Sequence, residues 1–261
     1  MRKKTLGLAL GAGGARGIAH ISFLRVLVEN GIEPSCISGS SIGAIIASMF
    51  ALGLTCEEME TKALSLKMRD IIDIDLLFFR KMGFIKGMKR ESILKSFLGD
   101  KAFSDCRIPF CCTAVDIMTG DKVILKEGPL LPAVLASSTI PSVFEPVEID
   151  GRYLVDGGVL MRLPIEPLKE FKPDVIVAVD VLGDSLTGIL PKNILYTLIR
   201  TINIMDYEIT KSYSHHADLL VTIDQPEIDQ FIVKNLDKSL EAGKAAGERA
   251  LPQIKKLLGM K

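Results

Sequence analysis

A serine lies at the centre of the pattern Gly39-Ser40-Ser41-Ile42-Gly43. This Gly-x-Ser-x-Gly spacing is typical of a sharp turn from a strand into a helix, which leaves the serine hydroxyl exposed as a nucleophile. Glycines two positions before and after the serine allow the turn to close. The apolar run 42–52 that follows predicts a buried helix, whose N-terminus favours a negative charge at Ser41. The five residues alone would also fit an ordinary glycine- and serine-rich turn.

A glycine-rich segment, Gly-Ala-Gly-Gly-Ala-Arg-Gly at residues 11–17, lies closer to the N-terminus. It follows the apolar stretch 6–10, which predicts a buried strand, and it precedes residues 18–29, whose apolar spacing predicts a helix. A second short strand at 35–38 then leads into the serine turn. This order predicts a βαβ unit, and therefore a parallel sheet covered by helices.

The glycine-rich segment has three interpretations. A dinucleotide site would need Gly-x-Gly-x-x-Gly, but Gly17 comes one residue late, and Glu33 is a poor match to the acidic residue of that motif. An oxyanion hole would use unobstructed backbone N–H groups, here those of Gly13, Gly14 and Ala15. A plain strand-to-helix turn would need no chemical role. We favour the oxyanion hole, because it complements a serine nucleophile.

Ser41 would need a base, because a serine hydroxyl is a weak nucleophile. One candidate is the pair His215-His216, since the order Ser41, Asp156, histidine matches the triads of α/β-hydrolases. However, the pair ends a long helical pattern, and the third histidine, His20, fits a packed helix position. The other candidate is Asp156 itself, at a strand end before two glycines. Burial beside Ser41 would raise its pKa from about 4, so that it could accept a proton near neutral pH.

The composition excludes several classes of protein. The chain has 261 residues, 48% of them hydrophobic, which is enough for one large domain or two small ones. Its 32 basic and 32 acidic residues give no net charge, whereas nucleic-acid-binding proteins usually have a basic excess. Five cysteines without a pairing pattern predict a reduced, cytoplasmic protein, and we expect no metal site. No apolar run is long enough for a transmembrane helix, and the N-terminal one is too short for a signal peptide.

The rest of the chain predicts alternating helices and strands without a repeat or a linker, so we expect one domain over residues 1–261. Helices are predicted at 57–68, 92–98, 132–138, 190–212 and 238–258, and strands at 108–117, 122–125, 153–155, 175–181 and 219–223. Segment 76–90 mixes aromatic and apolar residues with five cations and no acid. It suits a peripheral membrane contact or a flap over an apolar site. It also suits a core element with snorkelling lysines, which we favour slightly.

Taken together, these motifs resemble those of the patatin-like phospholipase family, in its bacterial branch. Residues 13–17 resemble the glycine-rich oxyanion motif of the family, residues 39–43 its nucleophile elbow, and Asp156-Gly157-Gly158 its Asp-Gly-Gly motif. Residues 136–146 resemble a further family stretch, and the similarity covers residues 5–180. The chain departs from the family pattern at two positions. Ala12 stands where a glycine is usual, and Met161 stands where an asparagine often follows the Asp-Gly-Gly motif.

The resemblance implies a three-layer α/β/α sandwich with a mostly parallel central sheet. It also implies a serine lipid acyl hydrolase of the phospholipase, lysophospholipase or esterase type that works without calcium or another cofactor. Ser41 would be the nucleophile and Asp156 the general base, in a dyad without histidine. The substrate, a lipid or acyl ester, would contact Arg16, Gly17, Ile42, Pro141, Phe144, Gly157 and Gly158.

The alternative to an enzyme is a regulatory or adaptor protein, catalytically weak, that keeps the same fold and lipid pocket. The two hypotheses differ in whether Ser41 is activated, and the intact motifs favour the enzyme.

Overall fold

The structure is a computed structural model of the chain. It describes residues 4–66, 83–85, 88–183, 191, 194–229, 232 and 234–260, with the backbone alone at 83–85, 195 and 199. Most of segment 76–90, the predicted membrane contact or flap, therefore lies outside the described residues. Among the described residues, no helix is long and apolar enough to span a membrane.

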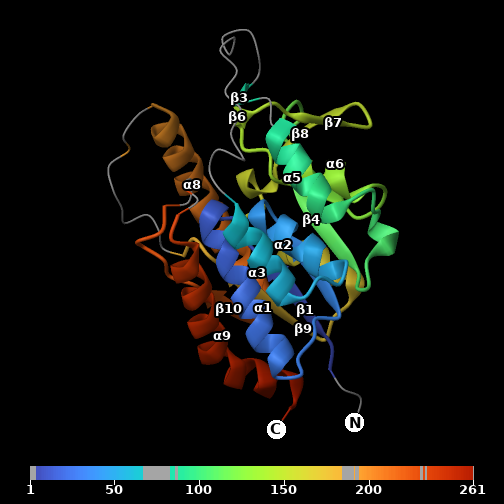
Figure 1. Cartoon of the computed structure of the whole chain (residues 1–261), viewed down its shortest axis with the longest axis vertical. Coiled ribbons are helices and arrows are strands. Elements are labelled where there is room, and N and C mark those ends of the chain that lie inside the picture. Colours follow the sequence, from blue (N-terminus) through green and yellow to red (C-terminus); the bar gives the residue numbers. More distant parts are fainter. Residues whose placement is uncertain are drawn as a thin grey trace.

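An eight-stranded, mostly parallel sheet forms the centre of the molecule (Figure 1). Its strand order is β10-β9-β1-β2-β4-β8-β7, and β5 also pairs with β4. The first five strands in this order run parallel, whereas β5, β7 and β8 are antiparallel to their neighbours. The strands are β1 (Leu6–Leu10), β2 (Cys36–Gly39), β4 (Phe110–Asp116), β5 (Lys122–Leu125), β7 (Val147–Ile149), β8 (Arg152–Asp156), β9 (Val175–Asp180) and β10 (Leu219–Thr222). A separate pair joins β3 (Gly83–Ile85) to β6 (Ser142–Phe144).

Helices pack on both faces of the sheet. The α-helices are α1 (Ala19–Glu29), α2 (Ile42–Ala51), α3 (Cys56–Ser65), α5 (Met88–Leu98), α6 (Leu130–Ser137), α7 (Ile165–Leu168), α8 (Ile194–Tyr213) and α9 (Leu236–Leu258). Short 3-10 helices are η1 (Gly14–Ile18), η3 (Phe103–Asp105), η4 (Gly157–Val159), η5 (Lys169–Phe171) and η6 (Ser214–His216). The predicted class, a mostly parallel sheet flanked by helices, is confirmed.

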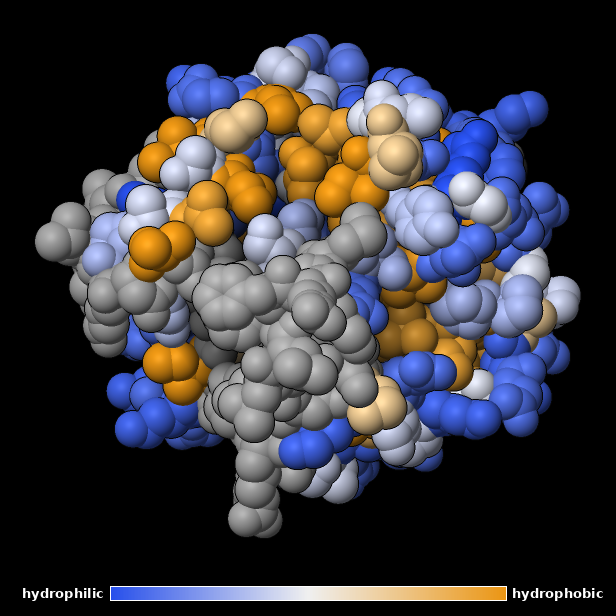
Figure 2. All heavy atoms as spheres, turned by 90° about the horizontal axis from the view of Figure 1, so that it is seen from above, coloured by the Kyte–Doolittle hydropathy of each residue, from blue (hydrophilic) through white to orange (hydrophobic). Residues whose placement is uncertain are grey.

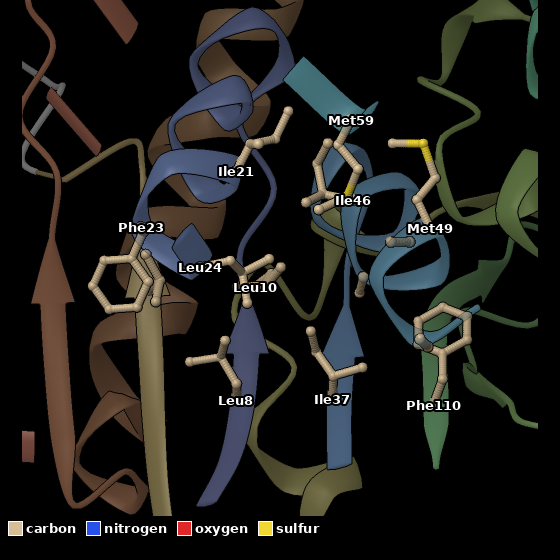
Figure 3. Close-up of a cluster of buried hydrophobic side chains, with 14 of the residues drawn as sticks. Leu8, Leu10, Ile21, Phe23, Leu24, Ile37, Ile46, Met49, Met59 and Phe110 are labelled. Carbon is tan, nitrogen blue, oxygen red and sulfur yellow. The ribbon is translucent and has the colours of Figure 1, made fainter. Parts of the chain in front are cut away.

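The larger core lies between the sheet and the helices α1, α2 and α9. Leu8 and Leu10 of β1 point into it, together with Phe23 of α1 and Ile46 of α2 (Figure 3). Ala9, which lies between Leu8 and Leu10 in β1, points to the opposite face and packs with residues of α7. Because side chains alternate along a strand, the fully buried run of β1 serves both layers at once.

The carboxyl ends of the parallel strands face the same edge of the sheet. β1 leads into the glycine-rich η1, β2 into the serine turn, and β9 into residues 181–183. Functional residues of open parallel sheets gather at this edge. The fold therefore brings the two glycine-containing motifs side by side.

Candidate active site

Ser41 lies between the last residue of β2, Gly39, and the first residue of α2, Ile42. Its backbone has φ 55° and ψ −125°, a strained combination for a residue with a side chain. The turn is held by close packing: a Cβ added to Gly43 would lie 2.2 Å from the carbonyl oxygen of Leu10, and one added to Gly39 would lie 2.4 Å from Cα of Ala44. Both glycines are therefore required for this geometry.

The Ser41 hydroxyl donates a hydrogen bond of 2.6 Å to Oδ2 of Asp156. The two residues are 115 positions apart in the chain, and the pairing of strands in the sheet brings them together. β2 pairs with β4 in parallel, and β4 pairs with β8 so that Ala114 lies opposite Asp156. The other carboxylate oxygen, Oδ1, accepts 2.7 Å from the N–H of Gly158, which fixes the orientation of the carboxylate.

Burial raises the pKa of Asp156 to about 6, above its ordinary value of 3.8. Three interactions oppose this rise: the hydrogen bond from Ser41, the N–H of Gly158 and the positive charge of Arg90. Arg90, from α5, donates to the carbonyl of Ser138 at 2.8 Å and to Oγ1 of Thr139 at 2.9 Å. A carboxylate with a pKa near neutrality can accept a proton more readily than an ordinary aspartate.

The glycine-rich segment supplies backbone N–H groups beside Ser41. η1 begins at Gly14 and Gly13 precedes it, so the N–H groups at its start have no acceptor within the helix. Gly13 and Gly14 line the same cavity as Ser41, whereas Ala15 does not. A Cβ at Gly13 would lie 2.3 Å from Cγ2 of Val181, so this close approach requires glycine.

Ser41 and Asp156 open into a small cavity of about 70 Å³, which we call the Ser41 cavity. Its walls come from the glycine-rich segment, from Ile140 and Pro141, and from the inner side of α8, where Ile202, Asn203 and Asp206 face it. A larger cavity, of about 810 Å³, lies between α1 and α3 and contains neither Ser41 nor Asp156. We take the smaller one as the candidate site, because only it holds the paired hydroxyl and carboxylate.

Of the predicted substrate-binding residues, Pro141 and Gly158 line the Ser41 cavity. The other five lie outside its lining. Arg16 donates through Nε to the carbonyl of Ile228 at 2.7 Å, and burial lowers the pKa of its guanidinium. The ring of Phe144 lies 4.1 Å from the Arg90 guanidinium, in a cation–π contact.

The remaining three of these residues hold the turns together. A Cβ at Gly17 would lie 2.1 Å from Cγ2 of Ile42, so this pair packs η1 against the start of α2. A Cβ at Gly157 would lie 2.3 Å from the carbonyl oxygen of Thr113 in β4. These contacts are with the protein's own elements rather than with the cavity.

The three histidines lie outside the lining of the Ser41 cavity. His215 and His216 are exposed in η6, which precedes β10 and therefore lies at the amino edge of the parallel strands, opposite to Ser41. His20 is fully buried in α1, and its Nε2 donates to the carbonyl of Gly11 at 2.9 Å. Burial lowers the pKa of His20 to about 4, so its ring is neutral at physiological pH. The Ser41 hydroxyl donates to Asp156, and no histidine lines the cavity that holds these two residues.

The part of the chain that contains the candidate site matches a known family. A family model described as patatin-like phospholipase matches residues 8–169. The chain belongs to the patatin-like phospholipase family. The resemblance seen in the sequence motifs is thus confirmed, and the matched range contains Ser41, Asp156 and the glycine-rich segment.

Curated relatives in this family are longer than the chain. It is 36% identical over 178 residues to an uncharacterized NTE family protein of Mycobacterium tuberculosis, covering 68% of the chain and 49% of the relative. It is 31% identical over 199 residues to lysophospholipase nte1 of Emericella nidulans, covering 71% of the chain and 13% of that relative. The chain therefore spans about half the length of the first relative, 49%, and 13% of the second.

Solved structures share the fold of the chain at low sequence identity. Human GIVD cytosolic phospholipase A2 aligns with a TM-score of 0.59 and 11% identity, covering 98% of the chain and 60% of that structure. VipD from Legionella pneumophila aligns with a TM-score of 0.53 and 14% identity, covering 97% and 67%. At such identities the likeness concerns the fold alone.

A buried charged cluster that no sequence motif indicates lies on the wall formed by α8. Arg162 donates to Asp180 at 2.7 Å and to Asp206 at 3.3 Å, and all three side chains are buried. Thr210 adds a hydrogen bond to Asp206 at 3.2 Å. Burial raises the pKa of Asp206 to about 7. The available signal was Arg162 itself, a charged residue shortly after the Asp-Gly-Gly motif in an otherwise apolar run.

Proposed function

We propose that this protein is a serine lipid acyl hydrolase that uses a Ser41–Asp156 dyad. The observation that supports this proposal most is the 2.6 Å hydrogen bond from the Ser41 hydroxyl to a buried carboxylate in a cavity. Membership of the patatin-like phospholipase family supports a lipid ester as the substrate. Phospholipids, lysophospholipids and simple lipid esters all contain the acyl ester that this chemistry requires.

In the first half of the proposed reaction, Oγ of Ser41 attacks the ester carbonyl carbon while its proton passes to Oδ2 of Asp156. The oxyanion that develops accepts hydrogen bonds from the backbone N–H groups at Gly13 and Gly14, with Ala15 as a further candidate donor. The carbon–oxygen bond to the alcohol then breaks, and the alcohol leaves with the proton from Asp156. The product is an acyl ester on Ser41.

In the second half, Asp156 accepts a proton from a water molecule as that water attacks the acyl carbonyl. Collapse of the second tetrahedral intermediate returns the proton to Oγ of Ser41 and releases the fatty acid. The pKa of about 6 suits both directions of transfer, because the carboxylate is largely ionised at pH 7 yet basic enough to accept a proton. Every step uses groups of the protein and one water molecule, so we expect activity in the presence of a calcium chelator.

The apolar residues of the cavity wall would contact the acyl chain. Ile140, Pro141, Val159, Leu182 and Ile202 surround the space beside Ser41. We propose further that residues 1–261 act as one domain, because the central strand β1 is flanked by β9 from the C-terminal half of the chain and α9 packs on α1.

Labelling with a fluorophosphonate tests the proposal. Oγ of an activated Ser41 would displace fluoride and form a phosphorus–oxygen bond, and mass spectrometry would identify the modified peptide. We expect the label on Ser41, and no label in the Asp156→Asn variant at the same probe concentration. A folded protein that takes no label in the presence of detergent would contradict the enzyme, and would favour a regulatory protein that retains the fold.

A further inference from the structure

The outward side of α8 is apolar. Among the described residues of α8 up to Met205, every exposed one is uncharged: Ile194, Thr197, Leu198, Thr201, Ile204 and Met205. We call this set the α8 outer face. Ile194 is 80% exposed, Met205 60% and Leu198 47%, whereas surface helices normally turn such side chains toward the core. The first charged residue on this side is Glu208, one turn beyond Met205.

The inward side of α8 carries buried polar residues beside Ile202. Asn203 and Asp206 face the Ser41 cavity, and the Asp206 carboxylate is bound by Arg162. Thr210, one turn further, is also buried. Turning the helix to bury its apolar side would expose Asp206 and leave Arg162 and Asp180 without this partner in the interior, which is costly. The buried cluster therefore fixes α8 with its apolar side outward.

The first turns of the α8 outer face lie at the same end of the molecule as the Ser41 cavity. α8 begins at the upper end in Figure 1, and its inner side forms one wall of the cavity. Further exposed apolar residues lie at the carboxyl end of β4: Ile117 and Met118 follow this strand, and Tyr153 of β8 is hydrogen-bonded to Ile117 through the backbone. Figure 2 looks onto this end of the molecule and shows hydrophobic residues in several areas of it.

We propose that the α8 outer face docks onto the surface of a lipid bilayer or lipid aggregate and holds the Ser41 cavity against it. The proposal rests on the proposed function, because the same helix lines the cavity in which a lipid ester would react. Apolar side chains at an interface bind in proportion to the apolar area that they withdraw from water. Since this face is uncharged, it fits zwitterionic lipid, and its binding should not weaken with salt.

The test measures binding to phosphatidylcholine vesicles by co-sedimentation, with Ser41→Ala protein so that no lipid is consumed. The test variant adds Leu198→Asp and Met205→Asp, both at exposed positions that do not line the cavity. The matched control is Leu64→Asp, since Leu64 is a helical leucine of similar exposure, 50%, that lies on α3. We expect the double variant to bind at least about tenfold more weakly, because each large apolar side chain contributes about that much on burial. The control should bind like the parent, at both 50 mM and 500 mM salt.

A second measurement separates this proposal from the proposed function. With Ser41 intact, the Leu198→Asp, Met205→Asp variant should hydrolyse a water-soluble short-chain ester like the parent, but vesicle phospholipid at least about tenfold more slowly. If the parent hydrolyses neither ester yet binds vesicles through Leu198 and Met205, the proposed function fails and the docking surface stands.

Three outcomes would overturn the docking proposal. The parent could fail to sediment with vesicles, or the double variant could bind as well as the Leu64→Asp control. Alternatively, light scattering could show a dimer of the parent that the double variant dissociates, which would identify a second copy as the occupant of the face. Circular dichroism and urea unfolding of each variant establish that it is folded.

Discussion

At the scale of single residues, the candidate site is held in an unfavourable state by the fold around it. Ser41 has a positive φ, and Asp156 keeps a carboxylate in a buried position. Each feature costs free energy that the surrounding packing must offset. Such local conflicts with stability are expected where a protein has been shaped for chemistry.

The pH dependence of activity should report Asp156. The carboxylate must be unprotonated to accept the Ser41 proton, so kcat/KM should rise as the pH increases through about 6 and then remain level. Ser41→Ala and Asp156→Asn should each lower kcat/KM by about a thousandfold or more. Initial rates with a water-soluble ester between pH 4.5 and 9 measure both effects. Activity that persists in Asp156→Asn would exclude the dyad.

The same carboxylate should limit stability above pH 6. Because the pKa of Asp156 is higher in the folded protein than its ordinary value of 3.8, the fold binds this proton more tightly than the unfolded chain does. Its contribution is therefore most favourable at low pH and is lost as the pH rises from about 4 to about 6. Asp156→Asn should raise the free energy of unfolding at pH 8 by about 1–3 kcal/mol.

The control for this effect is the same comparison at low pH. At pH 4 the wild-type carboxyl is protonated in the folded protein, so the gain from asparagine should largely disappear. Urea unfolding at pH 4 and pH 8 measures the difference. An equal gain at both values would mean that the substitution acts through packing rather than through the charge.

Some site residues can be recognised from the sequence and others cannot, for a physical reason. Ser41 and Asp156 each belong to a short motif, so their types and neighbours could be recognised without knowledge of the fold. Arg90 and Asp206 are isolated residues in helices, and only the packing of α5 and α8 brings them near Asp156 or the Ser41 cavity. Arg16 shows the converse, since its motif suggested a substrate contact whereas its Nε binds the carbonyl of Ile228.

At the scale of elements, the serine turn depends on the contact between β1 and the start of α2. A Cβ at Gly43 would meet the backbone of Leu10 and Gly11, which cannot move without disturbing the central strand. Gly43→Ala should therefore lower the free energy of unfolding by about 3 kcal/mol or more. Gly31→Ala is the control, because Gly31 has φ +70° but open space around it, and should cost only about 1 kcal/mol. Similar losses in both variants, by urea unfolding, would contradict the tight contact.

The attachment of α8 depends on the buried cluster of Arg162, Asp180 and Asp206. Replacing Arg162 with methionine removes the cation and leaves two buried acids facing each other. The free energy of unfolding should fall by about 3–5 kcal/mol at pH 8. The loss should be smaller at pH 5, because the pKa of Asp206 is about 7 and its carboxyl is then protonated. Urea unfolding at the two values measures this.

A neutral version of the cluster is the matched control. Adding Asp180→Asn and Asp206→Asn to Arg162→Met removes all three charges and should recover most of the stability at pH 8. If the triple variant is as unstable as Arg162→Met alone, the loss comes from the packing of the arginine side chain rather than from unpaired charge.

Elements with a regular apolar pattern could be predicted to within a few residues. The helix predicted at 238–258 is α9, Leu236–Leu258, and the strand predicted at 175–181 is β9, Val175–Asp180. The short strand β7 was missed, because three residues give too little periodicity. For α8 the helix was predicted but its orientation was not, because the apolar side of this helix faces outward and the polar side is held by Arg162.

At the scale of the whole molecule, the direction of the strands places the candidate site at one edge of the sheet and the histidine pair at the other. β10, β9, β1 and β2 are parallel, so the turns after them share one edge and the segments before them share the other. Ser41 and the glycine-rich segment follow β2 and β1. His215 and His216 precede β10 and therefore lie at the other edge.

This separation predicts that the histidine pair takes no part in the reaction, although its order after Ser41 and Asp156 matches a triad. In the His215→Ala, His216→Ala double variant, kcat/KM and its rise through about pH 6 should be unchanged within about twofold, because a group must reach Ser41 to act as its base. Initial rates with a water-soluble ester, compared with those of Asp156→Asn in the same assay, measure this. A loss similar to that of Asp156→Asn would show that a histidine serves Ser41, which would require the segment before β10 to reach across the sheet.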